Sequence, residues 1–261
     1  MPVASRNTGD IREPCCVRYL QSLEMNSFIG TMPAVYERLY GANEVAEHAA
    51  IVSRRGAALV HAEMWQSAKG PLLCVVAEDR PGLLALVTDS LLAQDMAIQS
   101  ARVFCREVGK DRSEAVDFLG LRALGGSDDV AARLEGDGLQ AFAQSLSELI
   151  ASDMAQRAAA SSAGASPAET KPATRVYFER QSLAEGSYLL VVDAPDSDGL
   201  LHAVSSALYE KGMRIVACEI RTVGGRALDR FEVEPSSQRA LKDSELCDVQ
   251  LAILQALPAR R

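Results

Sequence analysis

The strongest constraint on this chain is an internal repeat. The segment DRPGLLALVTDSLLAQDMAIQSARVF, which begins at Asp79, aligns without gaps with DSDGLLHAVSSALYEKGMRIVACEIR, which begins at Asp196. Repetition at a fixed offset, here 117 positions, indicates that one structural unit occurs twice. Identical residues occupy the equivalent positions Gly82 and Gly199, Leu83 and Leu200, Leu84 and Leu201, Val87 and Val204, Leu91 and Leu208, Met96 and Met213, and Ile98 and Ile215.

Each copy is predicted to form a strand, a tight turn, a helix and a second strand. In the first copy the apolar run at 72–77 ends at the turn 79–82. Pro81 suits the first turn of a helix because its missing N–H would have no partner there. Apolar residues then recur at helical spacing over 81–94 before extended character resumes over 97–106.

Further elements complete the two copies. Each reads as β-α-β-β-α, and an isolated strand at 175–179 is available to complete one of them. This order predicts the α+β class: two ferredoxin-like β-α-β-β-α-β units with helices on one face of antiparallel sheets. The other predicted strands lie at 114–124, 188–194, 214–222 and 226–234, and the other predicted helices at 139–150, 199–211 and 243–257.

The composition along the chain predicts five segments. Small residues and two prolines at 155–174 cannot bury enough apolar area to offset the entropy of ordering, which predicts a linker. The expected segments are a poorly ordered tail at 1–30, a helical connector at 31–70, a first domain at 71–154, the flexible linker at 155–174 and a second domain at 175–257.

Charge and hydropathy exclude several kinds of partner. The net charge of −8 argues against general binding of nucleic-acid phosphates. No apolar run approaches the ~20 residues that a membrane helix needs, so no membrane association is expected. None of the six cysteines forms a CxxC, and Cys74, Cys105 and Cys218 lie in predicted strands. A cytoplasmic protein with reduced thiols is therefore expected.

Residue sets for catalysis, metals or cofactors are not evident. His48 and His61 lack the further ligands of a metal site. His202 shares a helix face with Ser206, but no third group is indicated to orient the histidine as a base. No nucleotide-binding glycine pattern occurs. We therefore expect no enzyme activity, no metal and no cofactor.

The two repeats resemble the ACT domain, a small ligand-binding module of regulators of amino-acid metabolism. The likeness is carried by the DRPGLLALV turn and helix and by its second copy with the following GGRALDRFEVE. It is closer to the tandem ACT region of the bifunctional uridylyltransferase and uridylyl-removing enzymes of nitrogen signalling. NEVAEHA at 43–49 and TRVYF at 174–178 resemble the segments before the two ACT copies there. The nucleotidyltransferase and HD phosphohydrolase domains of those enzymes have no counterpart in these 261 residues.

The resemblance implies an amino-acid site in each copy, between the turn and the start of the second strand. A helix N-terminus with exposed N–H groups suits a carboxylate. Gln99 offers a hydrogen bond that Val216 does not, and the second turn replaces Arg-Pro by Ser-Asp, so the first copy is favoured. The candidate ligand-binding residues are Asp79, Arg80, Pro81, Gly82, Leu83, Ile98 and Gln99 in the first copy, and Asp196, Gly199, Leu200, Ile215 and Val216 in the second.

Two functions compete on these grounds. The first is a non-catalytic regulatory module that senses a free amino acid, with glutamine as the first guess from the resemblance, and that acts on a regulatory protein partner. The second is an interaction module of the same fold that has lost ligand binding, in which the turns only connect strand to helix. In either case strand 97–106 is expected to pair with 214–222, within the chain or across a homodimer, because both form sheet edges.

Overall fold

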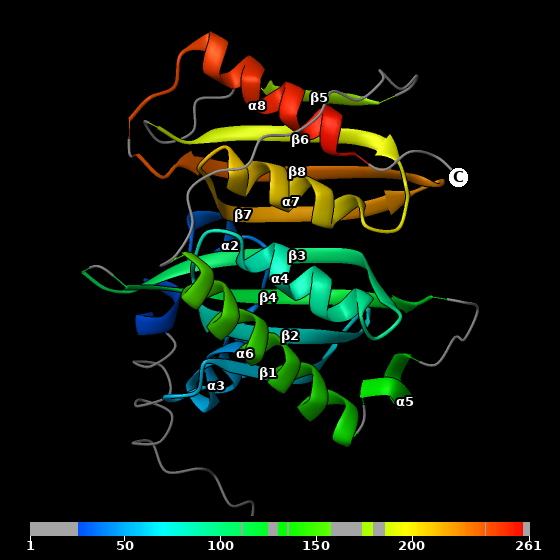
Figure 1. Cartoon of the computed structure of the whole chain (residues 1–261). Coiled ribbons are helices and arrows are strands. Elements are labelled where there is room, and N and C mark those ends of the chain that lie inside the picture. The colour runs from blue at the N-terminus through cyan, green and yellow to red at the C-terminus, as the bar shows by residue number, and fades with distance from the viewer. Residues whose placement is uncertain are drawn as a thin grey trace, which may run out of the picture.

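The computed structural model contains one eight-stranded antiparallel sheet (Figure 1). It describes residues 26–110, 112–124, 130–134, 136–157, 174–179, 186–237 and 239–257. From one edge to the other, the strands are β1 (Val60–Ser67), β2 (Gly70–Glu78), β4 (Arg112–Ala123), β3 (Met96–Gly109), β7 (Met213–Val223), β8 (Arg226–Pro235), β6 (Tyr188–Pro195) and β5 (Arg175–Glu179).

Four helices cover one face of this sheet, two for each repeat (Figure 1). Alternate strand residues such as Leu73, Val75 and Val192 point toward these helices and form the larger core. The predicted ferredoxin-like α+β class is thus confirmed for both repeats. The four helices are α4 (Leu83–Leu92) and α6 (Asp137–Arg157) in the first unit and α7 (Leu200–Glu210) and α8 (Asp243–Ala256) in the second, and the short α5 (Val130–Leu134) precedes α6.

The strand that completes each unit comes before the repeat and not after it. β1 pairs with β2, and β5 pairs with β6, each in antiparallel register. The observed order is therefore β-β-α-β-β-α in both units. The expected connector at 31–70 is helical only in part, because Val60–Ser67 is a strand that turns into β2 through Gly70, whose φ is +121°. Ala62 and Met64 alternate with polar residues there, as an edge strand requires.

The residues before β1 cover the opposite face of the first unit. α2 (Ala34–Glu37) and α3 (Ala42–Arg54) contribute to a second core that contains Cys74 and Val76, the alternate residues of β2. Helices therefore lie on both faces of the first unit, although the expectation of one face holds for the four repeat helices. Phe28, within the expected tail at 1–30, is also buried in this core.

This second core is aromatic and contains one buried histidine. The rings of Tyr40, Trp65 and Phe118 lie 4.2 to 4.7 Å from the ring of His48, centroid to centroid. The hydroxyl of Tyr36 lies 2.6 Å from Nδ1 of His48. Burial lowers the pKa of His48 to about 3, so this histidine is neutral at physiological pH.

The two units join through β3 and β7. These strands pair in antiparallel register from Ser100 opposite Arg221 to Phe104 opposite Ala217, which confirms the expected pairing within one chain. Because β3 and β7 pair with each other, neither edge is free to pair with a second chain in the homodimer that was the alternative. β1 and β5 are the edge strands of the described sheet.

Two expectations lie partly outside the described residues. Residues 1–25 of the expected tail and 158–173 of the expected linker are not among them, while α6 continues to Arg157. No helix in the described part of the chain is long and apolar enough to cross a membrane.

The aromatic core yields a test of stability. Phe118→Ala removes a ring that is 1% exposed and contacts Tyr40, His48 and Trp65. We expect a loss of about 3–5 kcal/mol in the free energy of unfolding, measured by urea denaturation, because a cavity replaces the ring. Leu228→Ala, at a side chain that is 42% exposed, is the control and should change it by less than about 0.5 kcal/mol. Equal effects of the two changes would contradict the packing described here.

Candidate functional site

The two turns of the repeat have the same backbone conformation. Gly82 has φ 82° and ψ 1°, and Gly199 has φ 80° and ψ 2°. Glycine adopts this left-handed region without the steric penalty of a Cβ atom, which explains why both copies have it. The N–H of Asp79 donates to the carbonyl of Ser113 at 2.9 Å, and the N–H of Asp196 donates to Gly225 at 3.0 Å. The first helical N–H is bonded within each turn, from Leu83 to the carbonyl of Arg80 at 3.2 Å and from Leu200 to that of Ser197 at 3.1 Å, so the N–H groups that lack intrahelical partners are those of the next residues.

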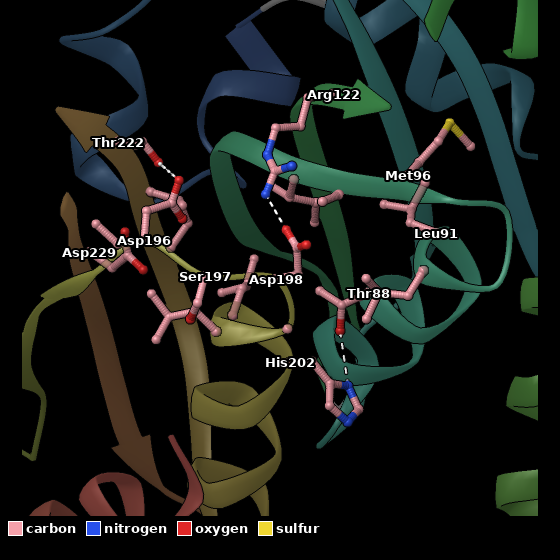
Figure 2. Close-up of a pocket in the computed structure, with 18 residues that line it drawn as sticks. Thr88, Leu91, Met96, Arg122, Asp196, Ser197, Asp198, His202, Thr222 and Asp229 are labelled. Carbon is pink, nitrogen blue, oxygen red and sulfur yellow. Dashed lines mark hydrogen bonds and ion pairs between the residues drawn. The ribbon is translucent and has the colours of Figure 1, made fainter. Parts of the chain in front are cut away.

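Each turn lies against a strand of the other unit. One cavity, called the first cavity, is lined by the turn 79–84 together with Met213 and Ile215 of β7. The second cavity is lined by the turn 196–201 together with residues 96–98 of β3 (Figure 2). The sequence analysis places each site between a turn and the strand of the same copy, whereas each cavity combines a turn with the strand of the other copy, because the antiparallel contact of β3 with β7 crosses the units.

Two candidate residues are not among those that line these cavities. Gln99 falls at a register shift between Ile98 and Ser100, and Val216 falls at the equivalent shift between Ile215 and Ala217. Such a bulge displaces one residue from the ladder. The other ten candidate residues, Asp79, Arg80, Pro81, Gly82, Leu83, Ile98, Asp196, Gly199, Leu200 and Ile215, all line one of the two cavities.

Both cavities are small. Each has a volume of about 30 Å³, which is about the space of one water molecule. Ligand pockets commonly have volumes of ~300 Å³ or more. A free amino acid therefore enters either cavity only if the turn or the facing strand moves.

A buried aspartate lines each cavity, and the sequence analysis did not identify either one. Asp117 of β4 and Asp229 of β8 are each 1% exposed, and they occupy equivalent positions opposite Val75 and Val192. Within the described residues, Oδ1 of Asp117 has no hydrogen-bond partner. The signal that could have revealed them is an aspartate two residues after an alanine in both copies, AVD and ALD, on a strand face whose neighbouring alternate residues are apolar.

Burial makes both carboxyl groups weak acids. It raises the pKa of Asp117 well above its usual value, and the nearby charge of Asp79 raises it further. Burial also raises the pKa of Asp229 to about 7, with Asp196 adding to the increase. The N–H of Arg221, which donates to Oδ1 of Asp229 at 3.3 Å, opposes this shift.

The first turn is held to the second unit by an arginine. Nε of Arg214 donates to Oδ2 of Asp79 at 2.9 Å, and the same oxygen accepts from Sγ of Cys105 at 2.8 Å and Oγ of Ser113 at 3.2 Å. Burial raises the pKa of the Cys105 thiol to about 12, so it remains protonated. Ala97 occupies the position in β3 that is equivalent to Arg214, so the second turn has no such arginine.

The second turn has different partners. Asp196 accepts from the hydroxyl of Thr222 at 3.3 Å, and Asp198 forms an ion pair with Arg122 of the first unit (Figure 2). His202 points toward α4, where Nδ1 lies 3.2 Å from Oγ1 of Thr88 (Figure 2). The two cavities are thus equivalent in backbone and different in charge.

The ring of His202 has two polar side-chain neighbours on α4, since its Nδ1 lies 3.2 Å from Oγ1 of Thr88 and 3.5 Å from Oδ1 of Asp89. The hydroxyl of Ser205 donates to the backbone carbonyl of His202 at 3.1 Å and does not contact its ring. Among the residues that the structure describes, no three His, Cys, Asp or Glu side chains cluster closely enough to hold a metal ion.

Comparisons with known proteins give little further guidance. No protein-family model matches the chain. No curated protein matches it either. Among solved structures, the chain is similar to aspartate kinase from Synechocystis, with 12% sequence identity and a TM-score of 0.35. The match covers 70% of this chain and 26% of the kinase chain, so it spans about a quarter of that protein.

The buried acid of the second unit yields a pH prediction. The pKa of Asp229 is about 7 in the folded state, whereas the ordinary value, which applies to the unfolded state, is 3.8. Between these two pH values the carboxyl group is protonated in the folded protein and ionised in the unfolded protein. Stability from this group is therefore present below about pH 4 and is lost as pH rises to about 7, by up to about 1.4 kcal/mol per pH unit. Asp229→Asn should reduce the slope of stability against pH, measured by urea unfolding between pH 5 and 7, by the contribution of Asp229, whereas Asp117, whose pKa is also raised, keeps its own contribution.

The control for this measurement is Asp193→Asn, which changes a partly exposed aspartate that is paired with Arg226 on β8. This variant should retain the slope of the unmodified protein over the same pH range. An unchanged slope in Asp229→Asn would show that Asp229 does not take up the proton.

Proposed function

We propose that this chain is a non-catalytic regulatory module of the ACT type, which binds a free amino acid between its two units. The observation that carries the proposal is the first cavity. There the start of α4 and the unpartnered Oδ1 of Asp117 line the same space. A buried carboxyl oxygen without a partner is costly, and ligand-facing sites are where such groups are retained.

The chemistry of the first cavity suits a molecule with one anionic and one cationic group. The N–H groups at the start of α4, together with the helix dipole, favour a carboxylate. Asp117 faces the same cavity and would accept hydrogen bonds from an ammonium group. An ammonium close to Asp117 would also lower the pKa that burial has raised, which favours the ionised carboxylate.

Binding would require the units to shift. The cavity of about 30 Å³ is lined on the β7 side by Met213 and Ile215, and the ion pair of Asp79 with Arg214 links the turn to β7. A ligand that separates the turn from β7 therefore changes the contact between the units. Such a change is how binding would reach a protein partner. Glutamine is the first ligand to test, by the resemblance to the uridylyltransferase ACT pair, and regulation of nitrogen metabolism is the setting that this resemblance implies.

A cytoplasmic location is part of the proposal. Cys74, Cys105 and Cys218 are free and buried in the sheet. Free thiols of this kind are common in reducing compartments.

The second candidate function is an interaction module without a ligand. It is favoured by the same small cavity volumes and by Arg214, which already neutralises Asp79. In this alternative the buried aspartates remain protonated and serve only the fold.

A thermal-shift screen of the twenty amino acids decides between the two functions. A ligand at 100 times its Kd stabilises the native state by about 2.7 kcal/mol, which raises the unfolding midpoint by several degrees. Titration calorimetry of the best ligand should then show at least a tenfold loss of affinity for Asp117→Asn, since the neutral amide no longer holds the ammonium as an ion pair.

Asp229→Asn is the matched variant, because it makes the same chemical change at the equivalent position of the second cavity. It should leave binding at the first cavity intact. If no amino acid shifts the midpoint at millimolar concentration, the ligand proposal is wrong and the interaction module takes its place.

A further inference from the structure

The contact between the units has an approximate twofold axis, and that axis passes through one residue pair. Arg102 of β3 lies opposite Glu219 of β7. These residues are equivalent in the repeat, since both lie 23 positions after the turn aspartates Asp79 and Asp196. In a symmetric pairing of two identical units, the residue at this position would face its own copy.

We propose that charged pairs across β3 and β7 determine which units pair, so that the first unit recognises the second unit and rejects a copy of itself. Nε of Arg102 lies 3.9 Å from Oε1 of Glu219, an oxygen that also binds Arg221 on the same strand, and the side chains of Arg102 and Glu219 are 28% and 31% exposed. Pairing of two first units would place Arg102 against Arg102. Pairing of two second units would place Glu219 against Glu219. Like charges directly opposite each other on neighbouring strands are destabilising.

A second charged pair across the two units also favours pairing of the first unit with the second. Arg122 of β4 binds Asp198 in the turn of the second unit (Figure 2). The residues equivalent to them are Glu234 of β8 and Pro81, by the register of the turns and strands. Two second units would therefore bring Glu234 toward Asp198, and two first units would place Arg122 beside Pro81.

The third charged pair disfavours the pairing of two first units but not the pairing of two second units. Arg214 binds Asp79, and Ala97 is the equivalent of Arg214 in the first unit. Two first units would leave Asp79 without its arginine, whereas two second units would keep an arginine near Asp196. All three pairs thus oppose pairing of two first units, and two of them oppose pairing of two second units.

These charged pairs act more by disfavouring wrong partners than by stabilising the correct pairing. Partly exposed ion pairs contribute little to stability, but a change from opposite to like charges alters the choice between partners. Arg102 is also fixed in place, since its guanidinium carbon lies 5.5 Å from the ring centroid of Tyr40. The partner that fits β3 is therefore an edge strand with an acidic residue at the axis. This inference does not depend on ligand binding.

Complementary charge reversals in the full chain test the proposal. Arg102→Glu places two glutamates at the axis, and Glu219→Arg places two arginines there, so each variant alone should unfold about 1–4 °C below the unmodified protein. When the two variants are unfolded, mixed in equal amounts and refolded together, opposite charges meet only between different chains. Native mass spectrometry with one variant isotope-labelled should detect a mixed dimer of twice the chain mass, with the unfolding midpoint restored.

The control is an equal mixture of Asp193→Arg and Arg226→Asp, which reverses an ion pair between β6 and β8 inside the second unit. Exchange of whole units cannot reunite opposite charges in that mixture, so no mixed dimer should form. Unchanged midpoints for the two axis variants would overturn the proposal. It is equally overturned if their mixture refolds only to single chains, or if the control mixture forms the mixed dimer as readily.

Discussion

The backbone ladder between β3 and β7 is the interaction on which the rest of this structure depends. It joins two four-stranded sheets into one and removes two exposed edges that would otherwise pair with other chains. It also sets the start of each of these strands against the turn of the opposite unit. Both candidate cavities exist only because of this crossing, since neither is lined by a turn and the start of the following strand from the same repeat.

The contact between the units carries polar groups that a purely structural interface would not need. Asp117 and Asp229 are buried on the side of the sheet that faces the helices, and both have raised pKa values. Burial raises the pKa of the Cys218 thiol, and the nearby charges of Asp117 and Asp229 raise it further. Burial of such groups costs free energy of folding unless they are protonated or paired.

Much of the fold could be predicted from the repeat. The turn at Gly82, the helix after it and the strand over 97–106 follow from a local pattern of apolar residues, and all three are present. The sequence does not predict the first edge strand, because Val60–Ser67 follows a true helix, α3, and its alternation is weak beside the helical pattern that precedes it. The cover formed by α2 and α3 on the opposite face was also missed. Nothing in a local pattern indicates which face of a distant sheet a helix will bury.

The sequence alone determined that two like units exist, that each starts a helix at a glycine turn, and that the two turns differ in charge. These properties depend on residues that are neighbours along the chain, so spacing and residue type are sufficient to reveal them. The three-dimensional arrangement was needed to establish which strand faces which turn, and that Asp117 and Asp229 line the same cavities as these turns. The pairing of β3 with β7 brings together residues more than a hundred positions apart in the sequence. The alternation of side chains along one strand shows which residues share a face, but it does not show which other strand will pair with it.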